Sequence, residues 1–326
     1  MKFNRRAMTV VVLALLAAPL AANAQPPAKV PRIGVLESRS SSKGLEAFKQ
    51  GLRERGYVEG KSIVFEYRWA NGKVAEFPKL AVELVRLKVD VIFAGSTPAA
   101  LAARDATNTI PIVFATVADP VGVRLISSLP RPGGNVTGLT TNNIEVVGKR
   151  LEILKEISGG KVSRGAMLFN PADASNVLGL RAAEDPARIL AMTLRPFPVK
   201  GPEDFEGAFS AMASERIESL WVAAGVLTTS HARRIAELAA RTRVPTIYGT
   251  REFVDAGGLV SYSASFTDNY RRAATYVDKI LKGATPRDLP VEQASTFDFV
   301  INLKTAKALG LALSPSVLLP AIQVID

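Results

Sequence analysis

The chain carries one plan of short apolar runs twice, and this repeat constrains its fold more than any other feature. The two copies comprise the runs 33–36, 63–67, 89–94 and 110–115, followed by 165–169, 193–199, 220–223 and 245–248. Corresponding runs lie 129 to 134 residues apart. Short apolar runs of this kind are typical of strands that are buried on both faces of a parallel sheet. We therefore expect an α/β fold with two similar lobes.

Amphipathic stretches separate these runs. Phe77, Ala81 and Leu84 fall on one stripe of a helix, and Leu45, Phe48 and Leu52 form another stripe in front of Gly56. Parallel strands need such crossover helices to connect them. Each lobe should therefore be a doubly wound parallel sheet covered by helices.

Eight strand–helix units could instead close into a single barrel. The spacing argues against a barrel, because the gap between the fourth and fifth runs is about twice as long as the others. This gap contains the sequence PRPGGN at 130–135, which is a strong loop signal. Two lobes need a long connection at this point, whereas a barrel does not.

Two later strand-like segments, 259–263 and 297–301, should cross back between the lobes. We expect the first lobe to comprise 30–138, completed by about 262–290, and the second to comprise 139–261, completed by about 291–326.

The first 24 residues have the three parts of a secretory signal peptide. Lys2, Arg5 and Arg6 give a positive start, a nine-residue apolar run follows at 10–18, and Ala22-Asn23-Ala24 precedes Gln25. The apolar run is too short to span about 30 Å of hydrocarbon. We expect export and cleavage between Ala24 and Gln25.

Composition excludes several classes of function. The 41 basic residues outnumber 30 acidic ones, but they are dispersed among acids and not interleaved with aromatic residues, so we expect no nucleic-acid partner. The chain has no Cys and a single His, His231, which argues against thiolate or His-built metal sites and a Ser-His-Asp triad. Nucleotide-binding glycine motifs and a G-x-S-x-G elbow are absent. We expect no metal, no cofactor and no catalytic residue, although an enzyme in a cleft remains an alternative.

Polar residues follow the predicted strands, at the sheet edge where open parallel sheets bind ligands. In the first lobe the candidates are Ser38, Ser41, Ser96, Thr97, Thr116 and Asp119, and in the second they are Asn170, Asp173, Ser175, Gly225, Tyr248 and Arg251.

Some of these residues have two interpretations each. Ser96 or Thr97 should cap a helix, and the start of that helix could also bind an anion such as a carboxylate. Asp119 could hold an ammonium group or cap the next helix. Arg251 could clamp a carboxylate. Tyr248 could pack on a ligand ring or in the core of its lobe.

Several longer motifs together resemble those of ABC-transporter substrate-binding proteins, a family that includes tryptophan and tyrosine binders. The resemblance extends from about Ile33 to the C-terminus and is carried by GYVEG at 56–60, AVELVRLKVD at 81–90, RPGGNVTG at 131–138, REFVDAGG at 251–258 and INLKTAKALG at 301–310.

This resemblance implies a type I periplasmic binding protein. Its two α/β lobes would be joined by three crossovers and would close on a small molecule by hinge motion. By position, the resemblance favours Ser38, Ser96, Thr97, Asp119, Asn170, Asp173, Gly225 and Arg251 as ligand contacts and adds Tyr262.

The expected function is therefore the periplasmic capture of a small metabolite, with an amino acid or a related carboxylate favoured. The carboxylate would lie at Ser96 and Thr97, an ammonium group near Asp119 or Asp173, and the loops 38–42 and 225–230 would select the rest of the ligand. The protein would act as a monomer and present the ligand to an ABC permease in the inner membrane. A ligand sensor for a membrane signalling protein is the second hypothesis.

Overall fold

Two separate sheets form the framework of the protein. The computed structural model describes residues 30–160 and 162–325, so the predicted signal peptide lies outside the described residues. The first sheet has the order β2 (Val64–Trp69), β1 (Arg32–Glu37), β3 (Val91–Ala94), β4 (Ile112–Val117), β5 (Val136–Thr140) and β11 (Glu292–Gln293). All its neighbouring strands pair in parallel.

The second sheet follows the same winding. Its order is β7 (Thr193–Pro198), β6 (Arg164–Phe169), β8 (Ser219–Val222), β9 (Thr246–Tyr248), β10 (Val260–Ala264), β12 (Phe297–Asn302) and β13 (Gln323–Ile325). Only β10 and β12 are antiparallel neighbours among the described strands. The prediction of two similar doubly wound lobes is confirmed, and the single-barrel alternative is wrong because the strands belong to two sheets.

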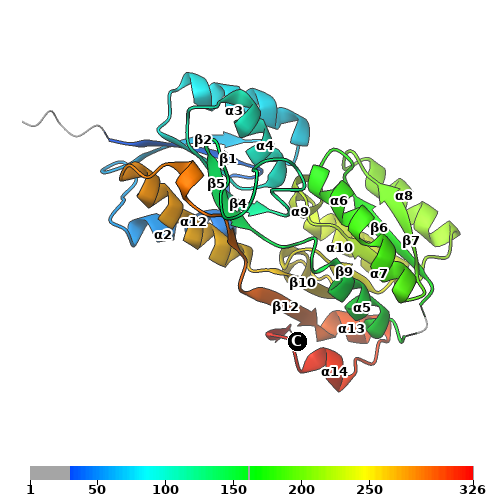
Figure 1. Cartoon of the computed structure of the whole chain (residues 1–326). Helices are drawn as coiled ribbons and strands as arrows, with labels where there is room; N and C mark the ends of the chain where they lie inside the picture. Colours follow the sequence, from blue (N-terminus) through cyan, green and yellow to red (C-terminus); the bar gives the residue numbers. More distant parts are fainter. Residues whose placement is uncertain (1–29, 161, 326) are drawn as a thin grey trace, which may run out of the picture. The chain divides into compact units, whose positions relative to one another are not determined.

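Alternate residues of each first-lobe strand face different helical layers, as the pleat of a strand requires. Ile92 and Ala94 of β3 pack with α3 (Phe77–Arg86) and α4 (Thr97–Ala106). Val91 and Phe93 pack on the opposite face with α2 (Lys43–Arg53) and α12 (Phe266–Leu281). Figure 1 shows α2 and α12 together on one side of this sheet and α3 and α4 on the other. The central strands β1, β3 and β4 are therefore buried on both faces, whereas the edge strand β2 is mostly half-buried.

The second lobe is built in the same way. Met167 and Trp221 pack with α5 (Val147–Ile157) and α7 (Glu184–Ile189), whereas Leu168 and Leu220 pack with α8 (Asp204–Ser214) and α10 (Ala232–Thr242). The remaining helices are α6 (Ala174–Ala182), α9 (Val226–Ser230), α11 (Glu252–Asp255), α13 (Leu303–Leu309) and α14 (Pro315–Leu318), with short 3-10 turns η1 (Val74–Glu76) and η2 (Pro286–Asp288).

Three segments connect the lobes: 141–146, Ser265 and 294–296. The expected lobe limits differ from the sheets at three places. Residue 138 lies inside β5, residue 262 lies inside β10, and β11 joins the first sheet although 291–326 was assigned to the second lobe. We propose lobe limits at 140, 264 and 294, because each then falls between two sheets.

A buried arginine, Arg150, joins the first of these connections to β10. Arg150 on α5 is 2% exposed, and its Nε donates to the carbonyl oxygen of Tyr262 at 2.8 Å. Its Nη1 and Nη2 donate to the backbone and side-chain oxygens of Asn143 at 3.1 and 2.6 Å. Burial lowers the pKa of Arg150 to about 10. One guanidinium group therefore ties the first connection to the strand that precedes the second.

Candidate functional site

A cavity of about 110 Å³ lies between the two lobes. A single water needs only about 10–15 Å³ measured in this way, so the space suits a small molecule. Most of its wall comes from the ends of β1, β3 and β4 and the loops after them in the first lobe, and from the loops after β6, β8 and β9 in the second. The start of α12 and the connection 141–146 complete it. These are the carboxyl ends of parallel strands, where ligands bind in open sheets.

The structure brings seven of the candidate residues to this cavity. They are Ser38, Ser96, Thr97, Thr116, Asp173, Ser175 and Gly225. The other six, Ser41, Asp119, Asn170, Tyr248, Arg251 and Tyr262, do not line it.

The two tyrosines outside the cavity serve the interior of the second lobe. Tyr248 is 1% exposed and stacks on Phe253 with ring centroids 4.7 Å apart. Tyr262 stacks on Phe297 at 5.9 Å. Both rings pack against other aromatic rings, and neither lines the ligand cavity.

The polar residues outside the cavity have local partners instead. Asp119 Oδ1 accepts the backbone N–H of Gly122 at 2.8 Å and closes a turn, and no described helix for it to cap lies between β4 and β5. Arg251 pairs with Asp255 at 3.3 Å. The Asn170 side chain accepts the N–H of Ala172 at 2.9 Å. Ser41 is exposed.

The start of α4 forms one wall of the cavity. Ser96 is the N-cap and accepts the N–H of Ala99 at 3.4 Å, Thr97 is the first helical residue, and Pro98 occupies the first turn. Pro98 has no N–H to satisfy and its fixed φ suits this position. Helix N-termini favour negative charge, so this wall suits a carboxylate.

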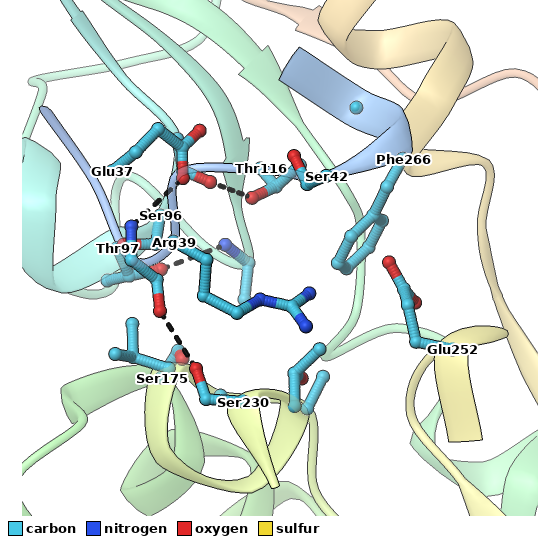
Figure 2. A pocket seen from close by; sticks show the side chains of 18 of the residues that line it. Glu37, Arg39, Ser42, Ser96, Thr97, Thr116, Ser175, Ser230, Glu252 and Phe266 are labelled. Carbon is cyan, nitrogen blue, oxygen red and sulfur yellow. Dashed lines mark hydrogen bonds between the residues drawn. The ribbon is translucent and has the colours of Figure 1, made fainter. Parts of the chain in front are cut away.

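Two oppositely charged side chains in the cavity have no partner among the described residues. Arg39, in the loop after β1, and Glu252, at the start of α11, make no side-chain hydrogen bond or ion pair within residues 30–160 and 162–325. Figure 2 shows both side chains, together with the ring of Phe266, facing the same space. Neither charge was predicted as a ligand contact, because nothing in the local sequence distinguishes an unpaired charge from a paired one.

Glu37, the last residue of β1, was also missed. It is 5% exposed and lines the cavity. Its Oε1 accepts the Tyr270 hydroxyl at 2.6 Å, and its Oε2 accepts the N–H of Ser38 at 3.1 Å. Burial raises the pKa of Glu37 to about 7, although both hydrogen bonds and the charge of Arg39 act against this shift.

Asp173 is the second buried acid of the cavity. Its Oδ1 accepts the N–H of Ser175 at 3.0 Å and the Ser175 hydroxyl at 2.6 Å. Burial raises the pKa of Asp173, and these hydrogen bonds oppose the change. The acid also caps α6 and is therefore held in place by the helix start.

Two polar contacts join the lobes beside the cavity. The hydroxyls of Ser38 and Ser230 lie 3.0 Å apart. Lys43 at the start of α2 pairs with Asp255 on α11 at 2.8 Å.

In the described part of the chain, no group of three or more acidic or His side chains is arranged to hold a metal ion. No described helix is both long enough and apolar enough to span a membrane.

Comparison with known proteins gives matches over nearly the whole chain. A family model for ABC transporter substrate binding proteins matches residues 29–325. A tyrosine-binding protein of Clostridioides difficile is 27% identical over 277 residues, which cover 85% of this chain and 79% of that protein.

Two solved structures share the fold closely. A conserved domain protein from Vibrio cholerae is 30% identical with a TM-score of 0.84, and the match covers 91% of this chain and all of the other. A domain from Streptococcus pneumonia in complex with L-Trp is 26% identical with the same TM-score, over 90% of this chain and 99% of the other.

Proposed function

Because this chain belongs to the family of ABC transporter substrate-binding proteins, we propose that it captures a free amino acid in the cavity between its lobes and delivers it to an ABC permease. The family and the relatives are binding proteins, so the prediction that the chain is not an enzyme is confirmed. We further propose that residues 1–24 direct export, that the protein acts in the periplasm and that it is a monomer.

The observation that carries the proposal is the pair of unpartnered opposite charges, Arg39 and Glu252. An α-amino acid at neutral pH carries one carboxylate and one ammonium group. The guanidinium of Arg39 can bind a carboxylate through two parallel hydrogen bonds. Ser96 and Thr97 at the start of α4 would share this carboxylate, and Glu252 would accept the ammonium group. Asp119, expected beside the ammonium group, is not part of this arrangement because it lies outside the cavity.

The relatives support an amino acid. One is named for tyrosine and another was solved with L-Trp, and both ligands carry the same two charged groups. Phe266 lines the cavity and offers an apolar surface to a ligand side chain.

The mechanism would be hinge closure. Arg39 and Ser96 belong to the first lobe, whereas Asp173 and Glu252 belong to the second. A ligand that touches both sets binds the closed arrangement better than an open one, and it shifts the equilibrium by that difference in affinity.

Isothermal titration of the purified mature chain with a panel of amino acids, sugars and dicarboxylates tests the proposal. We expect one or a few amino acids to bind, and Arg39→Ala to weaken their binding about 10- to 100-fold because a charge-assisted hydrogen bond is lost. Arg188→Ala is the matched control, since Arg188 is exposed and its side chain pairs with the equally exposed Asp185, outside the cavity.

An amidated form of the ligand separates the role of Arg39 from general damage to the site. The amide should bind the natural chain poorly and should lose little more with Arg39→Ala. Binding of sugars alone would refute the proposed function. Equal affinity of the natural chain and Arg39→Ala would refute the assignment of Arg39.

A further inference from the structure

Glu37 is a buried acid that lines the cavity, and the proposed contacts of the ligand with Arg39 and Glu252 give it no role. The following inference rests on the proposed function, because it concerns how the carboxylate of that ligand is recognised. Glu37 lies against Gly95, the residue immediately before the N-cap of α4. A Cβ added to Gly95 would approach Glu37 Oε1 to 1.8 Å and the Tyr270 hydroxyl to 2.4 Å. The carboxyl group of Glu37 and the start of α4 therefore share one corner of the cavity.

Both oxygens of Glu37 already accept hydrogen bonds. Tyr270 donates to Oε1 and also contacts the carbonyl oxygen of Gly95 at 3.0 Å, while the N–H of Ser38 donates to Oε2. Thr116 donates to the same Gly95 carbonyl at 2.5 Å. When Glu37 is protonated on Oε1, it can donate to the Tyr270 hydroxyl, which then donates to the Gly95 carbonyl. When the proton is on Oε2, no side-chain acceptor for it appears among the hydrogen bonds of the described residues, so this O–H can be donated to a ligand oxygen.

The charged groups around Glu37 come from three places. Arg39 lies in its own loop, Tyr270 comes from α12, and Asp173 and Glu252 line the same cavity from the second lobe. The other elements packed around it present uncharged groups: Trp69 on the neighbouring strand β2, Thr116 on β4, and Ser96 and Thr97 at the start of α4. Arg39 is thus the single cation beside three acids among the described residues that line the cavity.

A ligand carboxylate at the start of α4 would place a second acid beside Glu37. Two carboxylates that share a buried site cannot both be ionised without strong repulsion, and one of them holds a proton. The O–H of protonated Glu37 would then find its acceptor in the ligand. We infer that Glu37 is a specificity-determining residue that donates a hydrogen bond to the ligand carboxylate, and that the protein takes up one proton from solvent when the ligand binds.

The pKa of Glu37 in the ligand-free protein gives the pH range of this effect. Since it is about 7, the group is mostly protonated at pH 6 and mostly ionised at pH 8. The ligand should raise this pKa further. Proton uptake should therefore be small at pH 6 and approach one proton at pH 8, and the affinity should fall about tenfold from pH 6 to pH 8.

Titration calorimetry in buffers of different ionisation enthalpy measures this uptake directly. The probe is the amino acid found to bind in the panel above. Glu37→Gln keeps a neutral group with N–H donors in the same place, so it should retain the affinity seen at pH 6, hold that affinity at pH 8 and take up no proton. Glu252→Gln is the control: it removes a different carboxylate from the same cavity and should lower affinity while proton uptake remains.

Glu37 could instead bind the ligand ammonium group as an ionised carboxylate, and this role predicts the opposite proton exchange. If Glu37 were an ionised partner of the ligand ammonium group, binding would release a proton and Glu37→Gln would lose affinity at every pH. Proton release, or an affinity that does not change with pH, overturns the inference but leaves the proposed function intact. Failure of every amino acid to bind the natural chain would instead refute the proposed function. If Glu37→Gln does not fold, the sign of the proton exchange in the natural chain still decides.

Discussion

Glu37 should make the ligand-free protein less stable as the pH rises, and Glu37→Gln should remove this effect. Burial raises the pKa of Glu37 from 4.5 to about 7. Between these two values the folded chain binds more protons at this site than the unfolded chain does. The contribution of Glu37 to the free energy of unfolding is therefore fully present below pH 4.5 and is lost as the pH rises through 7.

The size of the effect follows from the same two values. A pKa difference between 4.5 and about 7 corresponds to about 3 kcal/mol at 25 °C. Gln does not titrate, so the stability of Glu37→Gln relative to the natural chain should increase by about 3 kcal/mol from pH 4.5 to pH 8. At about 2 °C per kcal/mol for a chain of this size, the relative Tm should rise by about 6 °C.

Thermal and urea unfolding of the ligand-free proteins at the two pH values provides the measurement. The difference in stability between the variant and the natural chain is compared at the two pH values, and the pKa of about 7 already includes the effect of the Ser38 hydrogen bond on the ionised group. Glu252→Gln serves as the control, since it removes a partly buried carboxylate that lines the same cavity. A difference between Glu37→Gln and the natural chain that stays constant from pH 4.5 to pH 8 would refute the reasoning.

Two further predictions concern the hinge and the corner of the cavity. Arg150→Met should lower the free energy of unfolding by about 2–4 kcal/mol, because it leaves the partly buried oxygens of Asn143 and Tyr262 without this donor; urea unfolding equal to that of the natural chain would show that the guanidinium does not hold them. Gly95→Ala should destabilise the fold by more than about 2 kcal/mol and abolish binding, because its Cβ would displace Glu37. Gly207→Ala, at an open position within α8, should instead stabilise by up to about 1 kcal/mol, and an equal loss in both glycine variants would contradict the assigned clash.

The fold could be predicted from the sequence because its central strands are buried on both faces and are therefore apolar. Every predicted apolar run overlaps a strand of one of the two sheets, including the more exposed edge strands β2 and β7. β5 was missed because its pattern is not apolar: Thr137 is fully buried, and its hydroxyl is satisfied by the carbonyl oxygen of Leu289 at 2.7 Å. β11 has two residues, too few for any periodicity.

The sequence predicted only where the site lies, at the carboxyl edge of each sheet. The sequence pattern shows which loops follow strands, and seven candidates from these loops line the cavity. It does not show which charges find partners inside the protein. Arg251 was expected to hold a carboxylate but pairs with Asp255, whereas Arg39 was passed over and faces the cavity without a partner among the described residues. Pairing is a tertiary property, so residue type alone could not rank these two arginines.

The contacts between the lobes also indicate what must drive closure. α11 carries Glu252, which faces the cavity, and Asp255, which pairs with Lys43 of the first lobe. The Lys43 side chain is 73% exposed, and exposed ion pairs contribute about 0–1 kcal/mol. The hydrogen bond between Ser38 and Ser230 adds about 1 kcal/mol. Such contacts orient the lobes but stabilise the arrangement in which they form only slightly. A ligand that satisfies Arg39 and Glu252 at once contributes more than both contacts together, so closure should follow ligand binding closely.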